Sequence, residues 1–154
     1  MITTDGVKFC RQKIDRLIDG VGKLQKSREV SLAFTNAQRS KSFLGLVLKD
    51  MSAPNPYPDS SDKDSKKIEP QADRAAMPYN FESTEHLAMV KEMRADFENV
   101  IEEIKDLYFR AQDTKIEPKN QPFFPTHLIV SLTALEEAKM WLGWELDRIR
   151  DEQK

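Results

Sequence analysis

Four polar residues at helical spacing are the strongest candidates for a binding site in this sequence. They are three or four positions apart, so that one face of a helix would carry Arg28, Ser31, Thr35 and Gln38. A guanidinium group beside hydroxyl groups is suited to phosphate oxygens, because it donates paired hydrogen bonds to them. Arg28 falls in the first turn of the predicted helix, where free N–H groups and the helix dipole attract anions. The alternative is a solvated helix face with an N-terminal arginine.

A second candidate site lies where an aromatic segment enters a later predicted helix. Tyr79 and Phe81 precede that helix, and Lys91 lies within it. An aromatic ring can stack on a base while a lysine faces a phosphate. The same pattern is also typical of a hydrophobic staple on a helix start, and the sequence leaves both interpretations open. Lys8 stands at the position equivalent to Lys91 in an earlier helix, without a tyrosine upstream.

Residue patterns of common enzymes and metal sites are absent from the sequence. His86 and His127 are the only histidines, and neither has a Cys or His at ligand spacing. There is no Gly-rich phosphate loop, nucleophile elbow or paired-carboxylate motif. The many glutamates fall on the outer faces of predicted helices, where solvation accounts for them. We therefore expect no catalytic activity, no cofactor and no metal.

The helices that carry these candidates belong to an internal repeat. At an offset of 98 residues, the second half matches the first as follows: Thr35, Lys41, Phe43, Leu44, Gly45 and Leu48 with Thr133, Lys139, Trp141, Leu142, Gly143 and Leu146. Upstream the offset is 83, and the matched residues are Arg11, Ile14, Leu17, Val21 and Leu24 with Arg94, Phe97, Val100, Ile104 and Leu107. Each half is thus the same two-helix unit, with a connection 15 residues longer in the second copy.

Apolar residues at alternating three- and four-residue steps predict four amphipathic helices, at about 5–25, 28–51, 84–112 and 126–151. The fold class is therefore all-α, with two tandem antiparallel helical hairpins at 1–51 and 80–154. The segment 52–79 is rich in Pro, Ser and Asp and predicts an extended linker. Lys41 and Lys139 fall in the apolar seams, where we expect the stems to pack and the ammonium groups to reach solvent.

The repeat also tests the candidate phosphate site. In the second copy the equivalents of the polar stripe are Thr126, Ile129, Thr133 and Glu136. A threonine replaces the arginine, an apolar isoleucine replaces the serine, and a glutamate replaces the glutamine. An anion site along this stripe is therefore expected in the first copy only.

Charge and composition narrow the class of protein. Residues 1–51 carry ten Lys/Arg against five Asp/Glu, whereas residues 80–154 carry ten against sixteen. The two halves either attract each other or a neighbouring subunit, or the first half holds an anion site. One cysteine among 154 residues and the lack of a long apolar run favour a cytoplasmic protein that binds no membrane. The apolar faces of four amphipathic helices favour a homo-oligomer, with a trimer preferred.

Several of these motifs resemble a known family. Arg28 and Thr35 followed by Phe43-Leu44, and Val90-Lys91 followed by Arg94-Ala95-Asp96-Phe97, are similar to the phage helical-hairpin sponges that oppose the CBASS and Thoeris defence systems. The Pro-Asn-Pro-Tyr-Pro-Asp segment after the second predicted helix also looks like phage proteins of this type. The likeness covers all four helices. Members of that family usually have one hairpin per chain, and this chain has two.

The resemblance implies a function and a site. A sponge of this kind sequesters cyclic di- or trinucleotides or cyclic ADP-ribose isomers in the cytoplasm of the infected bacterium, without degrading them and without binding DNA or RNA. Its cyclic-trinucleotide site corresponds to Arg28 and Thr35, with Ser31 between them, and its cyclic-dinucleotide site to Tyr79 and Lys91. Lys8 would be the first-copy counterpart of Lys91. The alternative function is a structural or adaptor oligomer of a phage that binds no small molecule.

Overall fold

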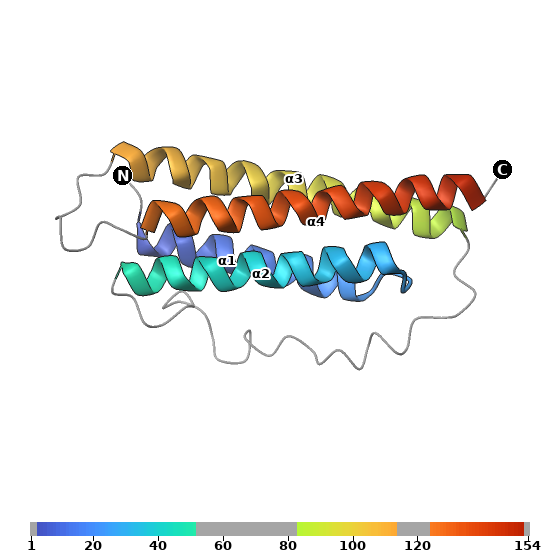
Figure 1. Cartoon of the computed structure of the whole chain (residues 1–154), viewed down its shortest axis with the longest axis horizontal. Helices are drawn as coiled ribbons and strands as arrows, with labels where there is room; N and C mark the ends of the chain where they lie inside the picture. The colour runs from blue at the N-terminus through green and yellow to red at the C-terminus, as the bar shows by residue number, and fades with distance from the viewer. Residues whose placement is uncertain (1–2, 52–82, 114–123, 153–154) are drawn as a thin grey trace.

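The computed structural model describes residues 3–51, 83–113 and 124–152, which form four long α-helices and no strand (Figure 1). They are α1 (Thr4–Gly22), α2 (Arg28–Asp50), α3 (Ser83–Asp113) and α4 (Phe124–Glu152). The predicted all-α fold is confirmed, and each predicted helix end lies within three residues of the observed one. None of the helices in the described ranges is long and apolar enough to cross a membrane.

Side-chain caps fix where the first two helices begin. The hydroxyl of Thr3 accepts a hydrogen bond from the N–H of Gly6 at 3.1 Å, and that of Ser27 accepts one from the N–H of Val30 at 3.0 Å. Such caps satisfy N–H groups that have no partner within the helix, and each contributes about 1 kcal/mol. The cap at Ser27 also sets the position of the next residue, Arg28, which is a predicted site residue.

The four helices form a bundle in which each hairpin is antiparallel and the two hairpins pack on each other (Figure 1). The most extensive interface joins α2 to α4, whereas α1 and α3 share the smallest of the four interfaces between neighbouring helices. α2 and α3 start at the same end of the bundle, and α1 and α4 start at the other. The start of α2 therefore lies beside the end of α4, which brings together residues more than 100 positions apart in the sequence.

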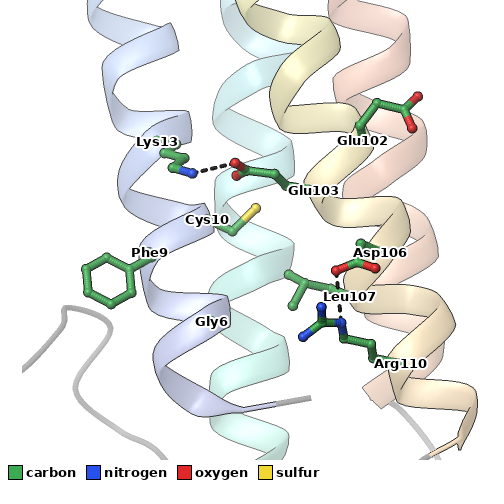
Figure 2. Close-up of a pocket in the computed structure, with 9 residues that line it drawn as sticks. All are labelled: Gly6, Phe9, Cys10, Lys13, Glu102, Glu103, Asp106, Leu107 and Arg110. Atoms are coloured by element: carbon green, nitrogen blue, oxygen red, sulfur yellow. Dashed lines mark hydrogen bonds and ion pairs between the residues drawn. The ribbon is translucent and has the colours of Figure 1, made fainter. Parts of the chain in front are cut away.

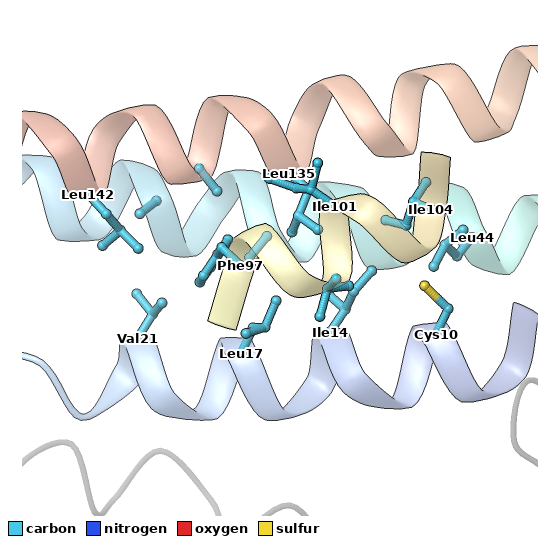
Figure 3. Close-up of a cluster of buried hydrophobic side chains, with 14 of the residues drawn as sticks. Cys10, Ile14, Leu17, Val21, Leu44, Phe97, Ile101, Ile104, Leu135 and Leu142 are labelled. Carbon is cyan, nitrogen blue, oxygen red and sulfur yellow. The ribbon is translucent and has the colours of Figure 1, made fainter. Parts of the chain in front are cut away.

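One continuous core lies between the helices, and all four contribute to it (Figure 3). Fully buried side chains meet there from α1, α2, α3 and α4: Ile14, Leu44, Phe97, Ile101, Ile104, Leu135 and Leu142. These residues occupy the apolar seams predicted from the sequence. Removing a buried ring such as that of Phe97 would cost about 3–5 kcal/mol, because a cavity would remain.

The internal repeat is also a repeat of contacts. Lys41 on α2 forms an ion pair with Asp15 on α1, and Lys139 on α4 forms one with Glu98 on α3. The carboxylates are 83 residues apart and the lysines 98 apart, which are the two offsets of the sequence repeat. We predicted packed stems with ammonium groups that reach solvent. Both side chains are partly exposed, at 23% and 29%, and each ammonium group also binds a carboxylate of the preceding helix, a partner that the sequence did not predict.

Arginine–glycine contacts recur in the same way. A Cβ atom placed on Gly45 would lie 3.6 Å from Nε of Arg11, and one placed on Gly143 would lie 3.5 Å from Cζ of Arg94. In each hairpin, the arginine of the first helix therefore lies against the bare backbone of a glycine in the second.

The interface of α2 with α4 contains one buried polar contact. The hydroxyls of Ser40 and Ser131 lie 2.9 Å apart, and that of Ser131 also donates to the carbonyl oxygen of Ser40 at 2.9 Å. The equivalent positions across the repeat are Ala138 and Ala33, which are buried as well. Small residues at these four sites let the two helices approach closely, and the paired hydroxyls leave no unsatisfied polar group there.

At each end of this interface a carboxylate of α2 contacts a basic side chain of α4, and the acidic and basic positions are exchanged when the two ends are related by the repeat. At one end Nδ1 of His127 lies 2.6 Å from the carboxylate of Asp50. At the other end Nε of Arg148 lies 3.7 Å from the carboxylate of Glu29. Glu29 and Arg148 are the counterparts of His127 and Asp50 at the offset of 98. The pseudo-twofold relation between the hairpins therefore extends to both ends of the bundle.

Candidate functional site

The polar stripe on α2 lies on the surface of the bundle. Arg28, Ser31, Thr35 and Gln38 are all exposed, while Val30 beside them is fully buried. The hydroxyl of Thr35 donates to the carbonyl oxygen of Ser31 at 3.1 Å, so while that bond is kept it can serve a ligand only as a hydrogen-bond acceptor. The prediction that these four residues share one accessible face is confirmed.

Arg28 has an aromatic neighbour that the sequence analysis did not identify. Its guanidinium carbon lies 5.7 Å from the centre of a ring of Trp141 on α4. A cation over an indole face is attracted by the electron density of the ring, by about 0.5–1 kcal/mol at an exposed site. This contact holds the guanidinium against α4.

A buried polar network lies beneath the start of α2. The carboxylate of Glu145 on α4 is fully buried, and it accepts hydrogen bonds from the hydroxyl of Ser27 and from Arg148, whose Nε lies 2.7 Å away. A buried carboxylate is tolerated only when it is hydrogen-bonded and paired with a cation, as it is here. Glu145 thereby orients the hydroxyl that caps α2. The expectation that the glutamates lie on outer faces was wrong for this residue.

Arg148 connects the network to the surface. Its Nη1 donates to Glu152 at 2.6 Å, and its Nε also faces Glu29 at 3.7 Å. Burial by itself lowers the pKa of Arg148, but its hydrogen bond to Glu145 and the charges of Glu145, Glu152 and Glu29 outweigh burial and raise it. The guanidinium therefore stays charged and fixed beside Glu145.

His86 on α3 is buried close to the same network. Burial lowers the pKa of His86, and the nearby charge of Glu145 only partly opposes that effect. The imidazole is therefore neutral at neutral pH. Among the residues the structure places, no group of three or more His, Cys, Asp or Glu side chains is arranged to hold a metal ion.

The other predicted site residues lie elsewhere. Lys91 is exposed on α3, which is diagonal to α2 in the bundle, so it belongs to a different face from Arg28. Lys8 is 6% exposed and lies in the second turn of α1, toward the end of the bundle opposite to Arg28. Tyr79 lies outside the described residues. The structure therefore brings together Arg28, Ser31 and Thr35 but not Lys91 or Lys8 with them.

The second copy has a different arrangement at the equivalent place. Thr126 stands where the first copy has Arg28, and it is exposed. Phe43, the counterpart of Trp141, lies 6.0 Å from the ring of His127 and has the guanidinium of Arg39 5.9 Å from its ring centre. An arginine therefore still lies over the aromatic ring, but it comes from the middle of α2 rather than from a helix start.

A groove of about 420 Å³ separates α1 from α3 at the other end of the bundle (Figure 2). Gly6 and Cys10 line it on α1, across from Leu107 on α3. Burial, reinforced by the charge of Glu103, raises the pKa of the Cys10 thiol to about 12. The thiol is therefore protonated at neutral pH and is a poor nucleophile.

Comparison with protein-family models, curated proteins and solved structures found no match to this chain. A proposal about function therefore depends on the residues themselves and on the motif resemblance described above. The strongest cluster is the exposed stripe of Arg28, Ser31 and Thr35, together with Trp141 and the buried network that supports the start of α2.

Proposed function

We propose that this protein is a non-catalytic sponge for a cyclic nucleotide signal of bacterial immunity. It would bind a cyclic di- or trinucleotide, or a cyclic ADP-ribose isomer, and hold it without chemical change. The observation that carries the proposal is the exposed guanidinium of Arg28 on the face of Trp141, with the hydroxyls of Ser31 and Thr35 on the same helix face. The resemblance of these positions to phage sponges supports the same ligand class.

The chemistry of the stripe suits a phosphodiester. The outer nitrogens of Arg28 supply two parallel donors to the two free phosphate oxygens, and the hydroxyl of Ser31 supplies a further donor one turn along the helix. Trp141 holds the side chain of Arg28, and the Ser27 cap holds the first turn of α2. The arginine therefore loses less conformational freedom when a ligand binds. A cyclic nucleotide also offers bases that stack on exposed rings.

The alternative is a structural or adaptor oligomer that binds no small molecule. The observation in its favour is that several large apolar side chains are exposed, above all Phe109 at 62% and Trp144 at 54%. Such residues are typical of surfaces that contact another protein. The two functions are compatible with the same fold, so an experiment must separate them.

Capture and release of the ligand is that experiment. The protein would be incubated with cyclic dinucleotides, cyclic trinucleotides and cyclic ADP-ribose, separated from free ligand, and heated, and the released nucleotide would be analysed by chromatography and mass spectrometry. Recovery of intact ligand supports the sponge. Recovery of a cleaved or altered nucleotide would indicate an enzyme, and no capture of any ligand would favour the adaptor.

The predicted cyclic-dinucleotide site needs its own variants. If Tyr79 stacks on a base and Lys91 faces a phosphate, Tyr79→Ala and Lys91→Ala each abolish cyclic-dinucleotide binding and spare the Arg28 site. Loss of one stacked base corresponds to about 1–3 kcal/mol, or roughly ten- to hundredfold in affinity. Unchanged calorimetric titrations with both ligand classes would remove Tyr79 and Lys91 from the site. A fall in melting temperature alone would identify Tyr79 as a helix staple.

A further inference from the structure

A polar groove between α3 and α4 contains a cation that has no partner in the described part of the chain. The groove has a volume of about 470 Å³ and is lined by Arg94, Glu98, Ile101 and Lys105 of α3 and by Glu136, Lys139 and Met140 of α4. It lies on the second hairpin. It is distinct from the stripe on α2, which shares no residue with it.

Arg94 is the unusual member of this groove. Its Nε is buried and has no hydrogen-bond acceptor among the described residues, and none of their carboxylates forms an ion pair with its guanidinium. The guanidinium lies against α4, since a Cβ on Gly143 would be 3.5 Å from its Cζ. A buried donor without an acceptor costs free energy, and an arginine fork held in this way is arranged to receive an oxyanion.

The other cations of the groove are already paired. Lys139 binds the carboxylate of Glu98, and a hydrogen bond from Lys139 lowers the pKa of Glu98, so this pair stays ionised. Nζ of Lys105 lies 3.4 Å from the carboxylate of Glu102. Arg94 is thus the cation of this groove whose charge is not balanced by a described carboxylate in direct contact.

The remaining lining residues narrow the class of ligand. Glu136 is exposed and unpaired among the described residues, so it repels a ligand with several negative charges. Met140 is 47% exposed, and with Ile101 it offers apolar contact beside the guanidinium. Methionine packs favourably against flat aromatic groups. The groove therefore suits one oxyanion group attached to an apolar or aromatic body.

The first hairpin lacks the same combination. The counterpart of Arg94 is Arg11, which lies against Gly45. The counterparts of Lys105 and Glu136 are Gly22 and Gln38. The first copy thus keeps the arginine–glycine contact but has neither the extra cation nor the acid at the rim, which makes Arg11 a matched control for Arg94.

We propose that the groove between α3 and α4 binds a small molecule with a single carboxylate or phosphate-ester group, which Arg94 grips through paired hydrogen bonds while Met140 contacts its apolar body. This site is independent of the one proposed at Arg28. Carboxylate and phosphate share the oxyanion that the arginine recognises, so the choice between them is made by measurement.

The test is an NMR titration of the full chain with three probes: benzoate, phenyl phosphate and inorganic phosphate. The Nε–H resonance of Arg94 and the methyl resonance of Met140 should shift together and saturate with benzoate or phenyl phosphate at millimolar concentrations. Saturation by benzoate alone identifies a carboxylate site, and saturation by phenyl phosphate identifies a phosphate-ester site. Saturation by inorganic phosphate alone would contradict the apolar contact, and no saturable shift with any probe would overturn the proposal.

Substitutions test whether binding of the probe depends on Arg94. Arg94→Gln should weaken the binding of the preferred probe at least tenfold, whereas Arg11→Gln and Arg28→Ala should leave it unchanged. If Arg94→Gln does not fold, as judged by circular dichroism, the shifts of Arg94 and Met140 in the unmodified protein still decide the question. Equal losses from Arg11→Gln and Arg94→Gln would show non-specific attraction and contradict the proposal. Loss of cyclic-nucleotide capture in Arg28→Ala with the probe still bound would separate the two sites.

Discussion

Asp15 on α1 is buried against Lys41 on α2, with the carboxylate side chain 6% exposed and the lysine side chain 23% exposed. The equivalent pair of the second hairpin, Glu98 and Lys139, is more exposed, at 42% and 29%. A buried ion that loses its partner stays in a medium that solvates it poorly, whereas an exposed one is solvated by water. The two pairs occupy equivalent positions but differ in burial.

This difference predicts unequal costs of breaking the two pairs. Lys41→Met leaves the buried carboxylate of Asp15 without its cation and should lower the free energy of unfolding by about 2–4 kcal/mol. Lys139→Met leaves the half-exposed Glu98 and should cost no more than about 1 kcal/mol. Urea unfolding followed by circular dichroism measures both. Equal losses would show that burial of the acid does not decide the strength of these pairs.

The candidate phosphate site predicts an asymmetric response of the repeat. Arg28→Ala should weaken capture of a cyclic trinucleotide by about 1.5–3 kcal/mol, the scale of hydrogen bonds to a charged group. Thr126→Ala, the same change at the equivalent position of the second copy, should leave affinity unchanged. Isothermal titration calorimetry measures both. Equal losses would mean that the two copies are functionally symmetric.

Burial of His86 predicts loss of stability in acid. Its pKa is lowered in the folded state, so between the folded and unfolded values the unfolded chain binds more protons. The stabilising contribution is therefore complete above the unfolded pKa of about 6.5 and declines as the pH falls below it. The groups that face His86 are Glu145, Arg148 and Glu152.

The variant that tests this is His86→Leu, compared with the unmodified protein. Unfolding midpoints measured between neutral and mildly acidic pH should fall in the unmodified protein, but less steeply in His86→Leu. A pH dependence that is the same in both proteins would mean that His86 is not responsible for it.

The buried thiol of Cys10 predicts slow chemical modification. With 3% of the residue exposed and the pKa of the thiol raised to about 12, almost no thiolate is available in the folded protein. A thiol-specific reagent should therefore react at the rate at which the chain opens, and rapidly once urea unfolds it. Rapid reaction of the folded protein, at the rate of a free thiol, would show that the groove beside Cys10 opens readily.

The exposed indole of Trp144 is a candidate contact between subunits of the predicted homo-oligomer. If that surface joins copies of the chain, Trp144→Ser should reduce the molecular mass measured by light scattering, while helix content stays constant. Ile129→Ser, at an exposed residue near the start of the same helix, serves as the control. A monomer at micromolar concentration before any substitution would contradict the oligomer, and with it any site shared between chains.

The sequence predicted the helices well because their apolar residues are regularly spaced. Residues such as Val30, Phe34 and Ala37 follow the helical period, and all three are buried. It also predicted the exposed stripe beside them, since that face follows from the same period. Register between helices cannot be obtained in this way. The contact of Arg28 with Trp141 depends on how α2 packs against α4, which no local pattern specifies.

Glu145 shows where more could have been inferred. It stands three residues after Leu142 and four before Ile149, which are both buried, so its spacing places it on the apolar side of α4. Arg148 follows three residues later, at the right distance to pair with it on the same helix. An acid on an apolar face with an arginine one turn away was a signal for a buried ion pair. Its partner Ser27, from α2, could be found only from the structure.

The acid–base contacts at the two ends of the α2 and α4 interface have a consequence for how this protein can vary. A hairpin that paired with an identical copy would place each residue at both ends, so every substitution would act twice. In this chain Asp50 meets His127 at one end and Glu29 meets Arg148 at the other, and each contact occurs once. Single substitutions can therefore change the surface and its binding properties at one end, while the contact at the other end continues to hold the two halves together.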